Sequence, residues 1–560
     1  MGAGCCAKQS LFIIEDNAVV GVNGNKDDIS NLELPRVVDA IGTNVFSECH
    51  GLKSLIIPDN VTHVGSNAFY HCNGLTSVNM PDTLKSIGSQ AFNECSAITD
   101  LTLPSALEDV GTRAFSYCHG LTSLKLPVLK KIGSGAFSHC SGLTALTLPR
   151  GLTKIGANMF ARCNRLTSIT LPRTVKRVGT HAFSHCGLTS LSLPATVKII
   201  EANAFYRCKR LTSLKLPKHL SSLGPGAFSG CRKLTSVILP ETLACVPDNA
   251  FYSCSALTSL TFPRNLESID ANAFTFCRGI VSLVLPDTVN NLGSQSFFAC
   301  LQLTSVKLPA SLLNVGDCAF RGCTALRRVE MPENLVGFGN GAFQDCTCLH
   351  SFAFPKNLAI IGNSAFSACC SLANPLVLPE TIEWVGHNAF RSCFGLKSVV
   401  LPNSLRIIND CSFMDCGGIT HLTLPSNLTR IGEQAFSHCT GLTSLVLPKS
   451  LHIVGSHAFA GCSQLTRVVF QARVSTAFIA WVVGASCNRS NWQLTTLKHS
   501  RNLLRLITAL AAERRAVASL DPDGDKMVFE GCPRIKSEHQ LYCESSANIS
   551  VGEESTDSLT

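Results

Sequence analysis

Apolar and polar residues alternate in a short phrase that recurs along most of the chain. In the copy at 442–464, LTSLVLPKSLHIVGSHAFAGCSQ, Leu445 and Leu447 alternate with Ser444 and Val446. A period of two places successive side chains on opposite faces of a β-strand. Pro448 ends the strand because proline has no N–H to donate to a neighbouring strand. The phrase therefore predicts one short strand in each copy.

The rest of each copy has the form LxxIGxxAFxxCxx. In the same copy, Leu451, Val454, Phe459 and Cys462 have the spacing of a loop followed by one short turn of helix. Ser456 is placed to cap that turn. The sequence predicts a coil made of a strand, a bend, a short helical turn on the outer side and a return.

Copies of this unit run from residue 29 to residue 471 and contain 20 strand-like segments. Between Cys49 and Cys462, 15 of the 18 steps from one repeat cysteine to the next are 23 residues. Two steps are 22 and one, which includes Pro375, is 24. A single unit buries too little apolar surface to offset the entropy of ordering it, so stability must belong to a stack of units. We expect an array of about 20 repeats over 29–471.

The unit LxxLxLPxxLxxIGxxAFxxCxx resembles the leucine-rich repeats of the BspA-like class, also called the Treponema pallidum type. The resemblance implies an α/β fold, a leucine-rich repeat solenoid with a curved parallel β-sheet and short helical turns on its outer side. The segment NAVVGVNGNKDDISNLELP at 17–35 resembles the hairpin that opens such arrays, and we assign residues 11–28 to an N-terminal cap. The resemblance also implies a scaffold for protein–protein contact.

The chain changes character after residue 471. Leu503, Leu506, Ile507 and Leu510 have helical spacing, and we expect a helical cap with a degenerate repeat fragment over 472–543. The arginines of this segment leave binding to an acidic membrane as an alternative. Residues 544–560 are Ser-rich and acidic, which is typical of a disordered tail.

The first ten residues, MGAGCCAKQS, carry a localisation signal. Gly2 resembles a myristoylation site, and Cys5 and Cys6 are positioned for palmitoylation, although Cys6 stands where the motif has Ser or Thr. Two acyl chains would hold the chain at a membrane where one would not. The alternative is an unmodified, flexible terminus.

Composition bears on the compartment and the partners. No apolar run reaches the length of a membrane span, and the N-terminus lacks the pattern of a secretory signal. We therefore expect a cytoplasmic protein, tethered to the inner leaflet of a membrane if acylated; the alternative is the cell surface, reached by an unconventional route. The net charge of +9, taken as thinly spread, predicts no nucleic-acid partner. We also expect a monomer.

Nineteen of the 29 cysteines occupy one position of the repeat. Parallel Cβ directions disfavour disulfides between adjacent coils, so we interpret these residues as small buried hydrophobes. The pairs Cys318/Cys323 and Cys411/Cys416 are too far apart in the array to form a zinc site. Histidine precedes the repeat cysteine in three SHC triplets, but other copies carry Arg, Gly or Ala there. We expect no catalytic residue, metal or cofactor.

The repeat glycine is interpreted as structural. Pro247 occupies its position in one copy, and proline fixes φ near −65°, so the position does not require a positive φ. Crowding by the neighbouring coil is the predicted reason for glycine.

The predicted working surface is the exposed face of the strands. Most of its side chains are Ser and Thr, which suit a solvated strand. The residues that interrupt this pattern are candidate partner contacts: Lys125, Lys215, Lys307, Arg327, Arg328, Glu330, His421 and Arg467. The patch of Arg327, Arg328 and Glu330 is the strongest candidate. We predict a non-catalytic scaffold for protein–protein interaction; the alternatives are a cell-surface adhesin or receptor-like protein and an enzyme with its site in 471–560.

Overall fold

The computed structural model describes residues 11–350, 353–373, 375–471 and 493–496. The chain divides into two units, Met1–Leu497 and Lys498–Thr560. The predicted acylation segment and the predicted tail at 544–560 lie outside the described residues, as does the predicted helical cap at 472–543 except for residues 493–496, which form a strand and not a helix.

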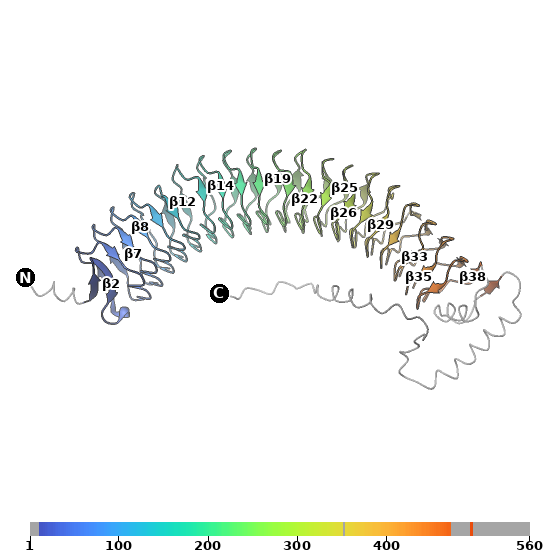
Figure 1. The fold of residues 1–560 in the computed structure, drawn as a ribbon, viewed down its shortest axis with the longest axis horizontal. Coiled ribbons are helices and arrows are strands. Elements are labelled where there is room, and N and C mark those ends of the chain that lie inside the picture. Colours follow the sequence, from blue (N-terminus) through green and yellow to red (C-terminus); the bar gives the residue numbers. More distant parts are fainter. Residues whose placement is uncertain (1–10, 351–352, 374, 472–492, 497–560) are drawn as a thin grey trace, which may run out of the picture. The chain divides into compact units, whose positions relative to one another are not determined.

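A hairpin opens the array within the residues assigned to the N-terminal cap. Strands β1 (Phe12–Glu15) and β2 (Ala18–Val22) pair antiparallel. Asp16 and Asn17 at the turn have φ of 47° and 60°, the left-handed conformation that the tightest hairpin turns need and that Asp and Asn tolerate. The 3-10 helix η1 (Lys26–Asp28) follows. Because β2 pairs with the first coil in parallel, the hairpin covers the end of the stack (Figure 1).

The LxLP phrase forms the first strand of the coil, as predicted. In β36, Ser444 and Val446 are exposed and Leu445 and Leu447 are buried. Neighbouring first strands pair in parallel and in register, so that Ser190 lies opposite Ser213, and among the described residues this ladder is interrupted after β7, β12, β21, β27 and β34. The first strands are β3 (Asn31–Glu33), β5 (Ser54–Ile56), β7 (Ser77–Asn79), β10 (Ser123–Lys125), β12 (Ala145–Thr147), β15 (Ser190–Ser192), β17 (Ser213–Lys215), β19 (Ser236–Ile238), β21 (Ser259–Thr261), β23 (Ser282–Val284), β25 (Ser305–Lys307), β27 (Arg328–Glu330), β30 (Leu376–Val377), β32 (Ser398–Val400), β34 (His421–Thr423), β36 (Ser444–Leu447) and β38 (Arg467–Phe470), followed by β39 (Gln493–Thr496).

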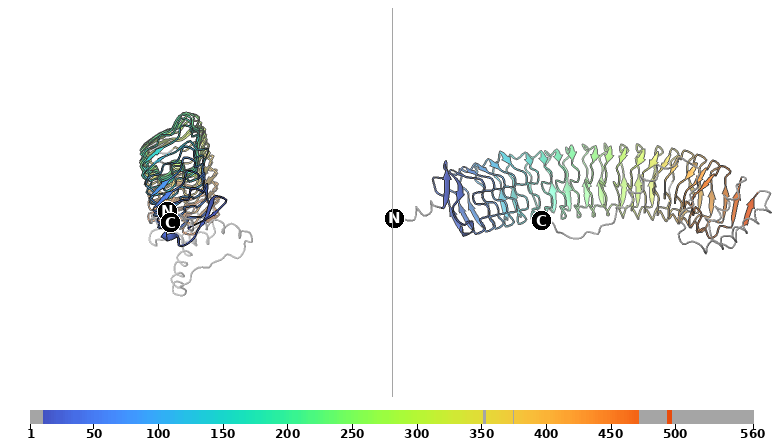
Figure 2. Two further views of the ribbon diagram at one scale, coloured as in Figure 1. Left: turned by 90° about the vertical axis from the view of Figure 1, so that its left-hand side faces the viewer. Right: turned by 60° about the horizontal axis from the view of Figure 1, so that its bottom comes forward.

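Each coil also has a second strand, which the sequence analysis did not predict. It consists of the two residues before the repeat glycine, the first facing out and the second buried, as in β13. These strands form a second set of parallel ladders, and both rows are visible in Figure 2. The second strands are β4 (Ala40–Ile41), β6 (His63–Val64), β8 (Ser86–Ile87), β9 (Asp109–Val110), β11 (Lys131–Ile132), β13 (Lys154–Ile155), β14 (Arg177–Val178), β16 (Ile199–Ile200), β18 (Ser222–Leu223), β20 (Cys245–Val246), β22 (Ser268–Ile269), β24 (Asn291–Leu292), β26 (Asn314–Val315), β28 (Gly337–Phe338), β29 (Ile360–Ile361), β31 (Trp384–Val385), β33 (Ile407–Ile408), β35 (Arg430–Ile431) and β37 (Ile453–Val454).

The outer segment of the coil is not helical, so the predicted helical turn is wrong. Two residues in this segment have a left-handed backbone; in one coil they are Asn249 and Ser253, both with φ of 56°. A right-handed helix cannot continue through such residues. The N–H of Phe251 instead donates to the carbonyl of Ala273 in the next coil, at 2.9 Å. The segment therefore forms a third ladder, here called the outer ladder, in which each coil donates to the one that follows.

The core is a ladder of stacked phenylalanine rings. Nineteen rings, from Phe46 to Phe459, lie one per coil with adjacent centroids 5.1–6.0 Å apart and ring planes within 15° of parallel. Offset stacking of this kind stabilises beyond the burial of apolar area alone. The repeat spacing of the sequence thus places one equivalent ring in every coil.

The repeat cysteines form a second internal row beside the rings. All nineteen are buried, as predicted, and all the cysteines of the described residues are free thiols. Each thiol from Cys72 onward donates to the carbonyl of a Phe in the preceding coil; for example, Cys254 Sγ lies 3.3 Å from the carbonyl oxygen of Phe228. The cysteine therefore fills the core and satisfies a backbone acceptor.

The repeat glycine is crowded, as predicted. A Cβ at Gly111 would lie 2.4 Å from the carbonyl carbon of Gly88 in the preceding coil. The φ of Gly111 is not positive. Close approach of the two backbones, and not a special conformation, therefore selects glycine at this position.

Candidate functional site on the strand faces

The outward positions of the first strands form the predicted working surface, here called the strand face. In β10, Ser123 and Lys125 are exposed on either side of buried Leu124. The backbone that carries these side chains is held in a parallel ladder. The strand face therefore presents side chains from a rigid support, at a spacing of about 4.8 Å between strands.

Four of the predicted partner contacts come together on this face. Lys307 in β25 lies opposite Glu330 in β27, and Arg328 Nη2 is 3.2 Å from Glu330 Oε1. Arg327 directly precedes β27, and its side chain is exposed. These four residues form one charged cluster. The remaining four lie on separate strands: Lys125 on β10, Lys215 on β17, His421 on β34 and Arg467 on β38.

The uniform threonines of the LTSL phrase have a structural role. The hydroxyl of Thr212 donates to the carbonyl of Thr189 in the preceding coil at 3.0 Å, and Thr235 repeats this bond to Thr212 at 3.3 Å. These hydroxyls reinforce the ladder at the start of the strand. Their repetition therefore does not mark a binding site.

An apolar stripe on the strand face was missed by the sequence analysis. Val377, Val400 and Val446 point outward with 57%, 38% and 45% of their surface exposed. Val377 and Val400 lie opposite each other in β30 and β32, and Thr423 continues the row in β34. The signal was present in the sequence, because most copies carry a polar residue at this position of the phrase. The stripe lies between the charged cluster and Arg467 in coil order.

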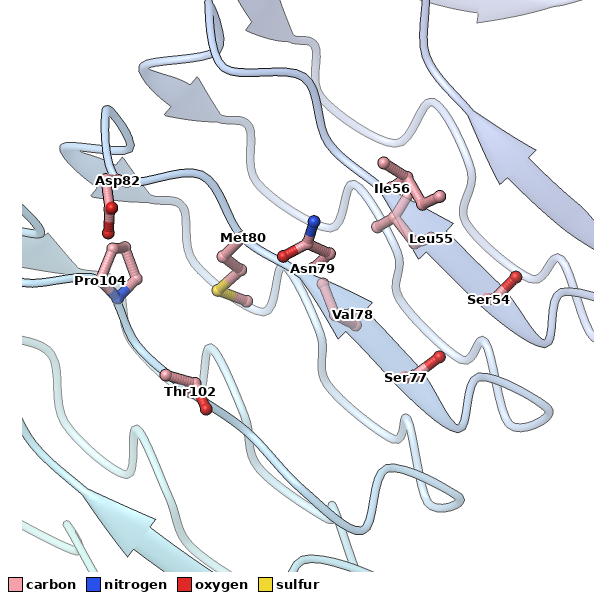
Figure 3. Close-up of a pocket in the computed structure, with 10 residues that line it drawn as sticks. All are labelled: Ser54, Leu55, Ile56, Ser77, Val78, Asn79, Met80, Asp82, Thr102 and Pro104. Carbon is pink, nitrogen blue, oxygen red and sulfur yellow. The ribbon is translucent and has the colours of Figure 1, made fainter.

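A shallow depression of about 410 Å³ interrupts the strand face near its N-terminal end (Figure 3). It lies where the ladder breaks after β7, since Thr102 is joined to the next strand only by an isolated bridge to Lys125. Ser77 and Asn79 line one side, and Thr102 and Pro104 line the other. The lining carries hydroxyls, an amide and the carboxylate of Asp82, but no cysteine or histidine. It therefore contains neither a Cys–His nor a Ser–His pair.

The SHC triplets do not form a Cys–His pair. The thiol of Cys140 is buried, donates to the carbonyl of Phe115 at 3.2 Å, and has its pKa raised by burial to about 12. His438 faces away from its cysteine, with Nδ1 3.5 Å from Asp415 Oδ1. Within the described ranges, no three His, Cys, Asp or Glu side chains are grouped to hold a metal ion, and no helix has the length and hydropathy of a membrane span.

The charge of the chain is not evenly spread. The sequence analysis took the net charge as thinly spread and on that ground predicted no nucleic-acid partner, and that premise is wrong. Residues 110–240 contain 19 Lys and Arg and a single acidic residue, Glu201. Residues 11–109 contain 13 Asp and Glu and only 4 Lys and Arg. All 19 cations of 110–240 are exposed. We call these coils the basic sector; charge counted over about six repeats, instead of over the whole chain, would have revealed it.

Two histidines of the basic sector should make the stability of the array depend on pH. Burial, with a further contribution from Arg162, lowers the pKa of both His139 and His185 to about 4. In the unfolded chain the pKa is near 6.5. The unfolded chain therefore binds more protons, and the stabilisation is complete above about pH 6.5 and is lost as pH falls toward 4.

The double variant His139→Asn/His185→Asn should lose less stability than the wild type between pH 7 and pH 5. Asparagine tolerates the left-handed backbone of both positions, which have φ of 61° and 59°. Urea unfolding followed by circular dichroism at each pH measures the difference. Equal losses in the two proteins would contradict the assignment.

The chain is similar to a known protein family and to solved structures. The family model described as BspA type leucine rich repeat region (6 copies) matches residues 24–144, 130–258, 245–373 and 368–478. No curated protein matches the chain. A leucine-rich repeat protein from Bacteroides ovatus is 22% identical over 87% of this chain and 97% of its own, with a TM-score of 0.40. The Treponema pallidum leucine-rich repeat protein is 31% identical over 33% of this chain and 78% of its own, with a TM-score of 0.27.

The family match and the resemblance of the repeat unit agree. The matched ranges span the array from its first coil to its last, and they contain the phenylalanine and cysteine rows described above. The chain therefore belongs to the BspA-type leucine-rich repeat family.

Proposed function

We propose that the chain is a non-catalytic scaffold that binds a protein partner on the C-terminal part of its strand face, over residues 305–467. The observation that carries the proposal is the exposed apolar stripe of Val377, Val400 and Val446. Val377 and Val400 are adjacent in the row, and Val446 follows beyond Thr423; exposed apolar side chains grouped in this way on one face mark a surface that another molecule covers.

The surroundings of the stripe support a protein as that molecule. Protein interfaces combine an apolar centre with a polar, partly charged rim. Here the stripe is followed in one direction by Lys307, Arg328 and Glu330 and in the other by Arg467. His421 lies beside the stripe, with Nδ1 2.8 Å from the hydroxyl of Thr420. Six of the eight predicted partner contacts thus surround one apolar centre.

The rigidity of the strands also favours binding. Val399 and Leu422 pair in register beneath the stripe, and both side chains of the charged cluster on β27 are already joined by an ion pair. A preorganised surface loses little conformational entropy when a partner docks. The preorganised strands therefore favour the docking of a partner.

Location and anchoring are part of the proposal. We propose a cytoplasmic scaffold in which acyl groups on Gly2, Cys5 and Cys6 act as a membrane tether. These three residues lie outside the described residues, and their support is the MGAGCC sequence alone.

The proposal is tested by placing charge on the stripe. The triple variant Val377→Asp/Val400→Asp/Val446→Asp keeps the buried residues and should retain the unfolding midpoint of the wild type. Burial of three unpaired carboxylates opposes docking, so partner recovery should fall at least about tenfold, as expected when hot-spot contacts are removed. Proteins captured from a lysate of the source cell on each immobilised chain are quantified by mass spectrometry.

The matched control carries the same charge change at the same strand position elsewhere. It is Asn79→Asp/Thr102→Asp/Thr261→Asp, and it should recover the partners of the wild type. Equal recovery by all three proteins, or no protein above the level of the bare matrix, would contradict the proposal.

A further inference from the structure

We propose that the basic sector, residues 110–240, is a binding surface for single-stranded nucleic acid. This inference goes beyond the scaffold function and uses other coils than the apolar stripe. Three observations carry it: an almost unopposed positive charge, a row of planar side chains, and an aromatic hollow at the end of that row.

The positive charge is exposed and nearly free of local acid. Glu201, the one acidic residue of the sector, is half-buried, pairs with Arg177 and accepts from the backbone N–H of Thr180 at 2.8 Å. Lys130 pairs with Glu108 at the edge of the sector. The charge of Glu201 is thus already engaged within the protein. Clustered cations of this density are the electrostatic signature of a surface that binds a polyanion.

The cations lie on more than one side of the coil. Lys125 and Lys215 belong to first strands, whereas Lys131, Lys154 and Arg177 point outward from second strands. A third group follows the repeat cysteine where the chain returns to the first strand: Arg165, Lys209, Arg210, Arg232 and Lys233. A flexible strand can reach several of these groups, but a flat bilayer meets one side. The sector exposes only Val128 and Ile238 as large apolar side chains among its residues, so it offers little to insert into lipid.

A planar side chain precedes the repeat cysteine in five successive coils. We call these residues the planar row: Tyr117, His139, Arg162, His185 and Arg207. Their backbone N–H groups belong to the outer ladder, for example from Arg162 to the carbonyl of Ser184 at 2.7 Å. The ring of His139 stacks on that of Tyr117 with centroids 4.0 Å apart and planes 15° from parallel. The row therefore holds stacking groups and guanidinium cations at the regular spacing of the coils.

The mixture of aromatic rings and cations in the planar row distinguishes a nucleic-acid ligand from other polyanions. Single strands bind to proteins by stacking unpaired bases on aromatic or guanidinium planes while cations contact the phosphates. A duplex hides its base faces, and an acidic polypeptide has no planar bases to stack.

A hollow at the C-terminal edge of the sector is wide enough to admit a base. It measures about 290 Å³ and is lined by Tyr206 and Tyr252, with Gly226 in the coil between them. Two coil spacings separate the tyrosines by about 9.6 Å along the array, and a ring stacked between two others needs about 7 Å. The Arg207 guanidinium lies 5.3 Å from the centroid of the Tyr206 ring. The hollow thus has tyrosines on two of its coils and a cation beside one of them.

The test uses the full chain and a fluorescein-labelled U12 oligonucleotide, with binding followed by fluorescence anisotropy. If about seven phosphates are contacted, the slope of log K against log salt should be near −5, and affinity should fall about a thousandfold between 50 and 200 mM salt. The same measurement with dT12 compares DNA with RNA. Binding of either oligonucleotide supports the proposal, and the ratio of the two affinities shows which nucleic acid the sector prefers. No binding of either at 50 mM salt overturns it.

Two variants separate charge from stacking. Arg162→Gln/Arg165→Gln/Arg207→Gln/Arg210→Gln should reduce the salt slope by about 3. Tyr206→Ser should weaken binding about tenfold, the range of one base–aromatic stack, and leave the slope unchanged. The matched control, Lys356→Gln/Lys397→Gln/Arg406→Gln/Lys449→Gln, removes four exposed cations outside the sector and should bind U12 as the wild type does.

Other outcomes would overturn the proposal. They are an equal loss in the control variant, equal affinity for a 12-base-pair duplex, and displacement of U12 by polyglutamate of matched charge at the same concentration. Binding to phosphatidylserine vesicles with the same sensitivity to the four Arg→Gln changes would assign the sector to a membrane instead.

Discussion

Replacing Phe228 with alanine is expected to lower the free energy of unfolding of the surrounding coils by about 3–5 kcal/mol. The ring is fully buried and stacks between Phe205 and Phe251, with centroid distances of 5.2 and 5.7 Å. Its removal leaves a cavity and breaks both stacks. Since each coil contacts only its neighbours, the loss should divide the array into two cooperative blocks.

Hydrogen exchange measured by mass spectrometry in increasing urea locates the effect. The coils next to residue 228 should exchange first in Phe228→Ala. The matched control is Phe394→Ala, because Phe394 is 53% exposed and should change stability by less than about 0.5 kcal/mol. A cost below about 1 kcal/mol at Phe228, or equal costs at the two positions, would show that the ring ladder does not hold the array together.

Gly111→Ala is expected to destabilise the array by about 1–3 kcal/mol, the usual cost of forcing an extra atom into a packed site. The added Cβ would lie 2.4 Å from both the carbonyl carbon of Gly88 and the N of Ser89. These are backbone atoms, so the clash can be relieved only by moving one coil relative to the other. The change in the urea midpoint measures the cost.

Gly156→Ala provides the opposite case at the same repeat position. A Cβ there meets nothing within 4 Å, because the second-strand ladder is broken between β11 and β13. The copy before the break is one residue short, over 127–133. The φ of Gly156 is not positive, so alanine fits without strain. Alanine should therefore stabilise the array by about 0.4–1 kcal/mol, because it reduces the conformational entropy of the unfolded chain. Similar costs at the two glycines would refute crowding as the reason for glycine.

The parts of the fold that repeat strictly could be predicted from the sequence. The alternation in LTSLVLP identified the first strand, and the 23-residue spacing identified the stack, because each depends on a period that the residues show directly. Cys254 and its equivalents could be placed in the core for the same reason. Pro247 was enough to argue that crowding, and not backbone conformation, selects the glycine.

The remaining features have no period of their own. A strand of two residues, such as β14, is too short to alternate, so the second ladder was not predicted. The first left-handed position of the outer ladder is most often Asn, which tolerates this conformation, but other copies carry Arg, Gln or Cys there, so the signal is not uniform. These residues were therefore interpreted as part of a helical turn.

The candidate sites were predicted only in part, because function here resides in departures from the repeat. Lys307, Arg328 and Glu330 stood out as charged residues and do form a cluster. Val377 and Val400 stand where most copies carry a polar residue, a signal that the apolar-rich phrase obscured, and the register of β30 and β32 shows that they lie in one row. The basic sector was not predicted because the net charge was taken over the whole chain, in which the acidic coils at 11–109 offset much of the sector's positive charge.

The outer ladder gives the two ends of the array different chemistry. Its amides all donate in one direction, as from Gln434 to Ser456 and from Phe436 to Ala458. Peptide dipoles aligned in this way add along a structure, as they do in a helix. The ladder is thus a polar column whose carbonyl pole lies at the first coil and whose amide pole lies at the last. A segment that closes the first coil must bring donors, one that closes the last must bring acceptors, and the two closures cannot be exchanged.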